Sequence, residues 1–228
     1  MTASYDDLPR LMSAMTGDEK HEPSATSTLD VLWVLYDRVL RVDPANPTDP
    51  DRDRFLLSKG HGPVSYYAVL AAKGFVPAAW LSTIGEFDSH LGYHPDRTLL
   101  PGVEISSGSL GHGLPLAVGT ALGLRAQGKP ARVFVLVGDA ELDEGSNQEA
   151  IVYAARAGLD RLTAIVIDNT SSTHGWPGGI ARRFGVEGWT TRTVNGRDHR
   201  EIEAALTAKR VGAPHVVVAR VEPKWSTR

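Results

Sequence analysis

The spacing of apolar residues along the chain predicts a layered α/β fold. Residues 133–137 and 165–167 are unbroken apolar runs, which is the pattern of parallel strands that are covered on both faces. The segment between them, residues 144–158, reads as a helix that ends at a glycine. A strand, a helix and a second strand in this order indicate a βαβ unit. We therefore expect an α/β protein with three layers, α/β/α, around a central and mostly parallel sheet.

The rest of the chain extends this pattern in both directions. We expect helices near residues 5–14 and at 29–40, 63–73, 77–84 and 200–210, and strands at 55–58, 190–194 and 215–221. Residues 85–107 and 170–184 read as irregular, and residues 110–126 are rich in the small side chains that permit close packing. Because no linker divides the chain, we expect one domain over residues 1–228, with an N-terminal extension at 1–20 and a short tail at 222–228.

Composition narrows the classes of function. The chain has 228 residues, a formal net charge of −3 and no cysteine. Basic and acidic residues are interspersed, which argues against a nucleic-acid partner, and no apolar run approaches the roughly 20 residues that cross a membrane. The absence of cysteine, and of a signal-peptide pattern at the start, favours a cytoplasmic protein.

Polar side chains follow the two apolar runs. Asp139 comes after the first run and Asn169, thirty residues later, after the second. Open α/β sheets bind ligands beyond the carboxyl ends of their parallel strands. A carboxylate and an amide that converge there suit a hard cation such as Mg²⁺ or Ca²⁺ carrying a diphosphate. An ordinary βαβ unit with polar strand ends would have the same pattern, and these residues alone leave that alternative open.

The same residues resemble the signature of thiamine-diphosphate-binding proteins, in which Gly-Asp-Gly is followed at a similar distance by Asn-Asn. The match begins with Gly138 and Asp139 and ends with Asn169. Ala140 stands in place of the second glycine and Thr170 in place of the second asparagine. Ala140 keeps the backbone N–H that a phosphate oxygen would accept, so the diphosphate interpretation survives both changes.

Three blocks in order resemble the N-terminal, diphosphate-binding half of transketolase. Residues 43–61 end in Ser58-Lys59-Gly60-His61, which is similar to the family's Ser-x-Gly-His block. Residues 101–113 are similar to its Gly-Val-Glu-Thr-Thr-Thr-Gly-Pro-Leu-Gly-Gln-Gly block, and residues 138–149 contain the metal motif. The resemblance covers about residues 20–221, and its ordered blocks argue against a chance βαβ match.

The resemblance implies a metal and cofactor site. Asp139 and Asn169 would bind Mg²⁺, or Ca²⁺ or Mn²⁺ in its place, through side-chain oxygens, and Ser171 through its backbone carbonyl. The segment from Gly138 to Glu141 would lie against the diphosphate of thiamine diphosphate. The turn that packs the cofactor's aminopyrimidine ring would be formed by Gly108, Ser109 and Leu110.

The resemblance also implies catalytic histidines. His61 falls on the Gly-His block, where it would lie near both diphosphate and substrate, while His94 and His21 have the family spacing of two further active-site histidines. Around His21 the sequence departs from the family pattern, and a lone histidine is often only structural. Family carboxylates at a dimer interface would correspond to Glu144 and Glu149, which acid preference at a helix N-terminus would explain equally well. The resemblance gives no role to His112 or His174.

The family's pyrimidine-binding and C-terminal domains have no counterpart in this sequence. The resemblance therefore implies the N-terminal subunit of a split transketolase, with a separate subunit that supplies those domains in an α₂β₂ assembly. The expected reaction is transfer of a two-carbon ketol unit from a ketose, or ketose phosphate, to an aldehyde acceptor. Two alternatives stay open: the α subunit of a 2-oxoacid dehydrogenase, and a non-catalytic scaffold subunit that has lost cofactor binding.

Overall fold

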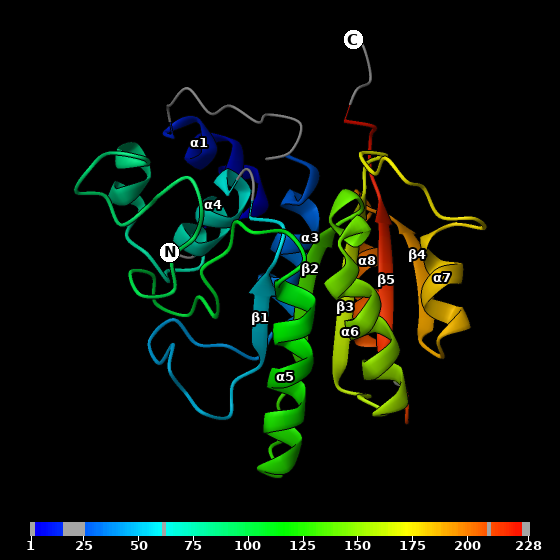
Figure 1. Cartoon of the computed structure of the whole chain (residues 1–228). Coiled ribbons are helices and arrows are strands. Elements are labelled where there is room, and N and C mark those ends of the chain that lie inside the picture. Colours follow the sequence, from blue (N-terminus) through cyan, green and yellow to red (C-terminus); the bar gives the residue numbers. More distant parts are fainter. Residues whose placement is uncertain (1–2, 16–25, 61–62, 209–210, 225–228) are drawn as a thin grey trace.

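The strands of the molecule form a parallel sheet. The computed structural model describes residues 3–15, 26–60, 63–208 and 211–224. Among these residues the sheet has five strands in the order β1-β2-β3-β5-β4, and each neighbouring pair is parallel (Figure 1). The strands are β1 Arg54–Leu57, β2 Val133–Gly138, β3 Leu162–Asp168, β4 Thr190–Asn195 and β5 His215–Arg220.

Helices cover both faces of this sheet. One face is covered by α3 Leu29–Val34, α4 Val64–Ala72 and α8 His199–Thr207, and α1 Leu8–Ser13 packs against α4. The other packs against α5 Gly113–Ala126, α6 Gly145–Arg156 and α7 Ile180–Val186. Short 3₁₀ segments are η1 Tyr5–Asp7, η3 Ala78–Thr83 and η4 Ala140–Asp143, and a π-helical turn, η2 Leu35–Val39, extends α3. The three-layer α/β/α expectation is confirmed, and the solved structures compared below share the fold.

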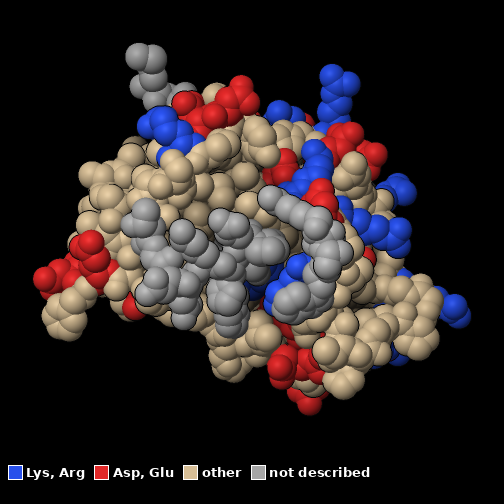
Figure 2. Space-filling model, turned by 90° about the horizontal axis from the view of Figure 1, so that it is seen from above, with Lys and Arg blue, Asp and Glu red and all other residues tan. Residues whose placement is uncertain are grey.

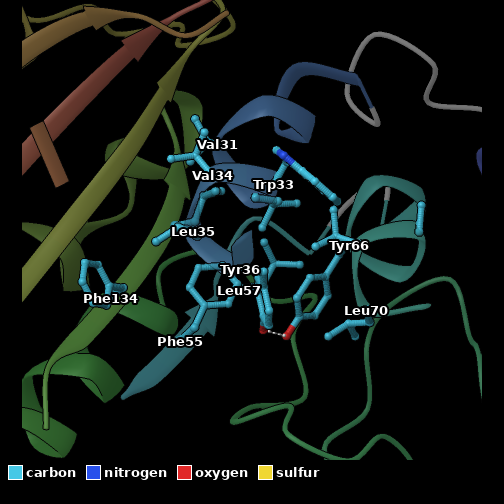
Figure 3. Packing of buried hydrophobic residues seen from close by; sticks show 14 of the residues in the cluster. Val31, Trp33, Val34, Leu35, Tyr36, Phe55, Leu57, Tyr66, Leu70 and Phe134 are labelled. Carbon is cyan, nitrogen blue, oxygen red and sulfur yellow. Dashed lines mark hydrogen bonds between the residues drawn. The ribbon is translucent and has the colours of Figure 1, made fainter. Parts of the chain in front are cut away.

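The central strand β2 explains how one sequence run builds two cores. Every residue of β2 is buried, and alternate side chains point to opposite faces because a strand repeats every two residues. Phe134 lies in the core formed with α3 and α4, and it pairs with Phe55 of β1 in the sheet (Figure 3). Val135 belongs to the core formed with α5 and α6. The sheet is thus fixed from both sides, which holds its strand ends in place.

A buried pair of tyrosines sits inside the first core. The hydroxyl oxygens of Tyr36 and Tyr66 lie 3.0 Å apart and hydrogen-bond to each other (Figure 3). Burial raises the pKa of both phenols well above the usual value, so both stay neutral. Each hydroxyl has a partner, which makes the burial of these large side chains tolerable.

The structure differs from the sequence prediction in the region after β3. The sequence predicts an irregular segment over residues 170–184, but α7 begins at Ile180, directly after Gly179, whose φ of 86° suits glycine. Ile180 and Phe184, one helical turn apart, are both buried against the sheet. Two apolar residues are too few to mark a helix in a sequence rich in glycine, and tertiary packing decides the outcome.

All strand ends that carry the predicted site lie on one edge of the molecule, at the top of Figure 1. Viewed from this side, Lys and Arg side chains are intermixed with Asp and Glu, without a broad patch of one sign outside the grey atoms (Figure 2). Within the described ranges, no helix has the length and apolarity needed to cross a membrane.

Candidate diphosphate and metal site

The two residues that anchor the predicted site lie on neighbouring strand ends. Asp139 directly follows β2 and Asn169 directly follows β3, and the paired strands keep these ends side by side. Their exposed fractions are only 1% and 2%. Buried polar side chains are costly unless they are partnered, so their partners indicate what the site is built for.

The carboxylate of Asp139 is held by the loop that follows β3. The backbone N–H of Ser171 donates to it at 2.7 Å, the hydroxyl of Ser171 also donates, and the N–H of Ala140 donates at 2.9 Å. In this structure the Asp139 side chain accepts the N–H of Ala140, and the contact of that N–H with a phosphate stays a prediction. The carboxylate is therefore fixed in position before any ligand arrives.

The backbone between the two anchors is strained. Thr170 has a φ of 55°, and no other described non-glycine residue has a positive φ. A β-branched residue in this left-handed region costs of the order of 1 kcal/mol or more. The conformation turns the N–H of Ser171 toward Asp139 at the point where the family would place a metal-binding carbonyl. Strain of this kind is typical of functional loops.

Asn169 provides the test of whether a metal fits here. Among the described residues, no donor lies within hydrogen-bonding distance of its buried side-chain oxygen, Oδ1. An acceptor left without a donor in this way costs about 1–3 kcal/mol. A hard cation would satisfy the Oδ1 atom, and Asn169 follows the strand next to the one that Asp139 follows. The donor set fits Mg²⁺, Ca²⁺ or Mn²⁺.

The site lacks the ligands to hold a cation by protein side chains alone. The described part of the chain contains no cluster of three His, Asp or Glu side chains with metal-binding geometry. Asp139, Asn169 and the carbonyl of Ser171 could supply three oxygens, and Mg²⁺ demands six. Mg²⁺ sites commonly complete this set with substrate phosphates and water. The residues present therefore fit a metal that binds together with a diphosphate.

Glu141 ties together the loops that surround the site. Its carboxylate, 1% exposed, accepts hydrogen bonds from the Ser58 hydroxyl, from the N–H of Gly111 at 3.0 Å and from the N–H of Gly138 at 3.3 Å. Burial raises its pKa, and the hydrogen bonds act in the opposite direction. The Ser58 oxygen in turn accepts from the N–H of Gly113 at 3.0 Å. The sequence predicts Glu141 as a cofactor contact, and the structure places its side chain in this loop network.

The predicted pyrimidine turn lies against His94. Gly108 has a φ of 148°, and a methyl group at this position would come within 3.2 Å of the His94 ring. Gly60 packs against Ser107 so closely that its missing Cβ would clash with the Ser107 hydroxyl at 2.6 Å. Ser109 is exposed and Leu110 is partly buried. The structure thus brings together the Gly60 loop, the Gly108 turn and His94.

Two predicted histidines, His61 and His21, lie outside the described residues. Gly60, the neighbour of His61, is described and lies at the Gly108 turn. His112 and His174 are exposed, as are Glu144, which precedes α6, and Glu149 in its first half. Their roles stay predictions.

Sequence reasoning missed the buried lysine of the Ser-x-Gly-His block. Lys59 is 8% exposed, and its side chain runs across Gly138, whose missing Cβ would lie 3.4 Å from the lysine Cδ. Burial lowers its pKa to about 8, against the attraction of Asp139. The signal was present in the sequence, since Lys59 stands inside the Ser-x-Gly-His block, but nothing local marks it as buried.

The fold and the site together define an α/β domain with a candidate site for a cation and a diphosphate at the ends of parallel strands. Comparison with known proteins identifies the family. Residues 12–221 match the family described as transketolase, thiamine diphosphate binding domain. The chain therefore belongs to the transketolase family and is its thiamine-diphosphate-binding domain.

Curated relatives agree with this assignment. The chain is 36% identical over 233 residues to one subunit of the apulose-4-phosphate transketolase of Actinobacillus succinogenes, and the match spans 95% of this chain and 84% of that protein. It is 35% identical over 206 residues to 6-deoxy-6-sulfo-D-fructose transketolase subunit SqwG of a Clostridium species, over 87% of this chain and 75% of that protein. The chain is thus a homologue of the N-terminal subunits of two-component transketolases.

Another relative carries a different name. The Rhodococcoides fascians protein named Ferredoxin fas2 is 60% identical over 219 residues, which is 96% of this chain and 72% of that protein. Iron–sulfur clusters of ferredoxins are held by cysteine thiolates, and these 228 residues contain no cysteine. The ferredoxin in that name has no counterpart in this sequence.

Solved structures support the fold. Transketolase from Leishmania mexicana superposes with a TM-score of 0.79 at 26% identity, over 96% of this chain. Transketolase from Campylobacter jejuni gives 0.77 at 28% identity, also over 96% of this chain. The chain spans 37% and 38% of those two proteins, so it corresponds to one part of a whole transketolase.

Proposed function

We propose that this chain is the cofactor- and metal-binding subunit of a two-component transketolase. The complete enzyme transfers a two-carbon ketol unit from a ketose, or ketose phosphate, to an aldehyde acceptor. A separate subunit contributes the pyrimidine-binding and C-terminal domains. The observation that carries the proposal is the buried, unsatisfied Asn169 oxygen on the strand end next to that of Asp139, whose carboxylate is held in place. Two relatives of this chain are named as single subunits of transketolases.

The residues of this chain would hold the cofactor and leave its activation to the partner. Asp139, Asn169 and the carbonyl of Ser171 bind the cation, and Glu141 fixes the loops around the diphosphate. Bound thiamine diphosphate supplies the carbanion chemistry and acts as the electron sink for the transferred ketol unit. His94, with His61 and His21, would hydrogen-bond substrate hydroxyl groups and carry protons near pH 7.

The proposal also includes the identity of the metal, the stoichiometry of the subunits and the location of the enzyme in the cell. We infer Mg²⁺ as the cation, an α₂β₂ heterotetramer and a cytoplasmic enzyme with the whole of residues 1–228 as one domain. Apolar side chains on the outer surfaces of α5 and α6 support a subunit interface there, since Leu116 is 49% and Tyr153 55% exposed. Exposed Glu144, at the start of α6, and Glu149, within it, could reach a partner chain.

A coupled assay tests the proposal. The chain is purified with its partner subunit, Mg²⁺ and thiamine diphosphate, and ketol transfer is measured over a panel of donors. The panel includes apulose 4-phosphate and 6-deoxy-6-sulfofructose, the sugars in the names of two relatives, and 2-oxoacids as negative donors. We expect transfer from at least one ketose, dependence on both subunits, and loss of activity in Asp139→Ala.

The assay also separates the alternatives. Turnover of 2-oxoacids with no ketose activity would replace the proposal by a 2-oxoacid dehydrogenase α subunit. Absence of cofactor binding in the assembled pair would point to a scaffold subunit. The named relatives favour neither, because they are transketolase subunits.

A further inference from the structure

Two carboxylates at the ends of one short 3₁₀ segment hold the loop that follows β3. Asp139 is the residue that caps the start of η4, and Asp143 is the last residue of η4. The backbone N–H of Ser172 donates to the Asp139 carboxylate at 3.3 Å. The hydroxyl of the same Ser172 donates to the two oxygens of Asp143, at 3.0 and 3.2 Å. Ser172 therefore links Asp139 of the candidate site to a carboxylate that the site itself does not contain.

Asp143 accepts further hydrogen bonds from the same loop. The backbone N–H of Thr173 donates to it at 3.2 Å, and the hydroxyl of Thr173 donates to it at 3.3 Å. Burial raises the pKa of Asp143, but hydrogen bonds from Ser172, Thr173 and the backbone of His174 prevail and leave that pKa below its usual value. Asp143 contacts three consecutive residues, so it fixes the path of the loop and not only one side chain.

This part of the loop needs such contacts because its first residue is strained. Thr170 has a φ of 55°, a conformation that a β-branched residue keeps only when its surroundings hold it there. The residues that bind Asp139 and Asp143 follow Thr170 directly in the chain. Ser171 lies between the strained residue and the Asp143 contacts, and its carbonyl is the predicted metal ligand of the loop.

The far end of the loop is anchored independently. Trp176 packs against the core formed with α5 and α6, and the Arg183 guanidinium lies 5.8 Å from the centre of its ring. The backbone N–H of Gly179 donates to the carbonyl of Trp176 at 2.7 Å. Loss of the Asp143 contacts should therefore release residues 170–173, next to the candidate metal site, and leave the end of the loop at Trp176 in place.

We propose that Asp143 is a positioning residue for the cation. Its hydrogen bonds to Ser172 and Thr173 hold the strained loop in place, and this fixes the direction of the Ser171 carbonyl. Asp143 acts through the loop, because its carboxylate oxygens already accept the loop donors. This inference rests on the proposed function, since it assumes that the cation and the diphosphate bind at the candidate site.

The test compares Asp143→Ala with a matched control, Asp160→Ala. Asp160 is exposed and lies just before β3, at the opposite edge of the sheet. Ser172→Ala removes the hydroxyl donor of the contact, and Asp143→Asn keeps one acceptor oxygen without the charge. Each full-length variant is mixed with the partner subunit and titrated with thiamine diphosphate by calorimetry over a range of Mg²⁺ concentrations. The melting temperature of each variant is measured without ligand.

We expect Asp143→Ala to raise the Mg²⁺ concentration for half-maximal cofactor binding about tenfold and Ser172→Ala to raise it about threefold. Asp143→Asn should give a value between those of wild type and Asp143→Ala, and Asp160→Ala should match wild type. Melting temperatures should change little, because the contacts lie in a surface loop. A fall in melting temperature that parallels the loss of affinity across the variants would overturn the proposal and make Asp143 a structural residue.

An unchanged Mg²⁺ requirement in Asp143→Ala would also overturn the proposal. The same holds if Asp143→Ala raises the requirement and Ser172→Ala does not, since the lost charge alone would then explain the effect. If Asp143→Ala does not fold, Ser172→Ala decides, and an unchanged requirement there overturns the proposal. Absence of cofactor binding in the wild-type pair would instead refute the proposed function itself.

Discussion

Two buried aspartates at opposite ends of the strands differ in their partners. One is paired within the chain and stabilises the fold, and the other lies in the candidate site. Asp53 precedes β1 and is 0% exposed, and Asp139 follows β2 and is 1% exposed. Asp53 forms ion pairs with Arg41 at 2.9 Å and with Arg132 at 2.6 Å. Asp139 has backbone and hydroxyl donors, and the neighbouring strand end carries the unsatisfied amide oxygen of Asn169. The chain neutralises the first carboxylate itself, and we propose that a bound cation neutralises the second.

The largest expected effect on stability comes from substituting Asp53. Asp53→Asn removes the buried charge that accepts hydrogen bonds from the partly exposed Arg41 and Arg132, so it should lower the free energy of unfolding by about 3 kcal/mol. Urea denaturation of the full chain measures this loss. The folded variant should bind Mg²⁺ and thiamine diphosphate with wild-type affinity, because Asp53 lies at the edge remote from the site. A loss below about 0.5 kcal/mol would show that Asp53 is not a structural anchor.

The corresponding change at Asp139 should weaken cofactor binding strongly and lower stability less. Asp139→Asn keeps the shape of the side chain and removes the negative charge that a cation needs. We expect Mg²⁺-dependent affinity for thiamine diphosphate to fall about 100-fold, with a smaller loss of stability than in Asp53→Asn. Calorimetry and urea denaturation on the same preparations give both numbers. Equal cofactor affinity in Asp53→Asn and Asp139→Asn would contradict the assignment of Asp139 to the cofactor site.

A smaller effect is expected from the loop network under the site. Ser58→Ala removes a buried hydroxyl that donates to Glu141 and accepts from Gly113. The loss of both hydrogen bonds should reduce stability by about 1–3 kcal/mol and weaken cofactor binding only modestly, because Glu141 loses one donor of several. Ser82→Ala, at an exposed serine, is the control. Equal melting temperatures of the two variants would show that the network is not tightly formed.

The pH dependence of stability tests the ion pairs of Asp53 separately. Burial raises the pKa of Asp53, but the side-chain and backbone hydrogen bonds from Arg41 and Arg132 prevail and leave that pKa below its usual value. A carboxyl with a lowered folded pKa contributes stability above its unfolded pKa and loses it as the pH falls through the folded value. The stability gap between wild type and Asp53→Asn should therefore be full at pH 6 and narrow below about pH 4. A gap that stays constant to about pH 3 would contradict the ion-pair account.

The sequence was sufficient to predict features that depend on residues close together in the chain. The apolar runs of β2 and β3 and the polar residues directly after them predicted both the parallel strands and the placement of Asp139 and Asn169 at one edge. Those features follow from residues close together in the chain. The family blocks added the loops around them, and the comparisons confirmed the family.

The sequence was insufficient where the contacts are long-range. Glu141 bonds to Ser58 across 83 residues and to Gly111 across 30, and no periodicity reveals such a network. The burial of Lys59 depends on Gly138, a residue of another strand. The helix α7 is stabilised by two side chains, Ile180 and Phe184, that are buried against the sheet. Packing and burial decide each of these features, and only the folded chain shows them.

We propose that Asp139 and Asn169 bind a cation only together with the diphosphate of the cofactor. The most direct measurement is calorimetric titration of thiamine diphosphate into the chain mixed with its partner subunit, in the presence of Mg²⁺ and again in excess chelator. We predict binding that is tight with Mg²⁺, at least about 100-fold weaker without it, and absent in Asp139→Ala. Binding that is equally tight in chelator, or that survives in Asp139→Ala, would contradict the account.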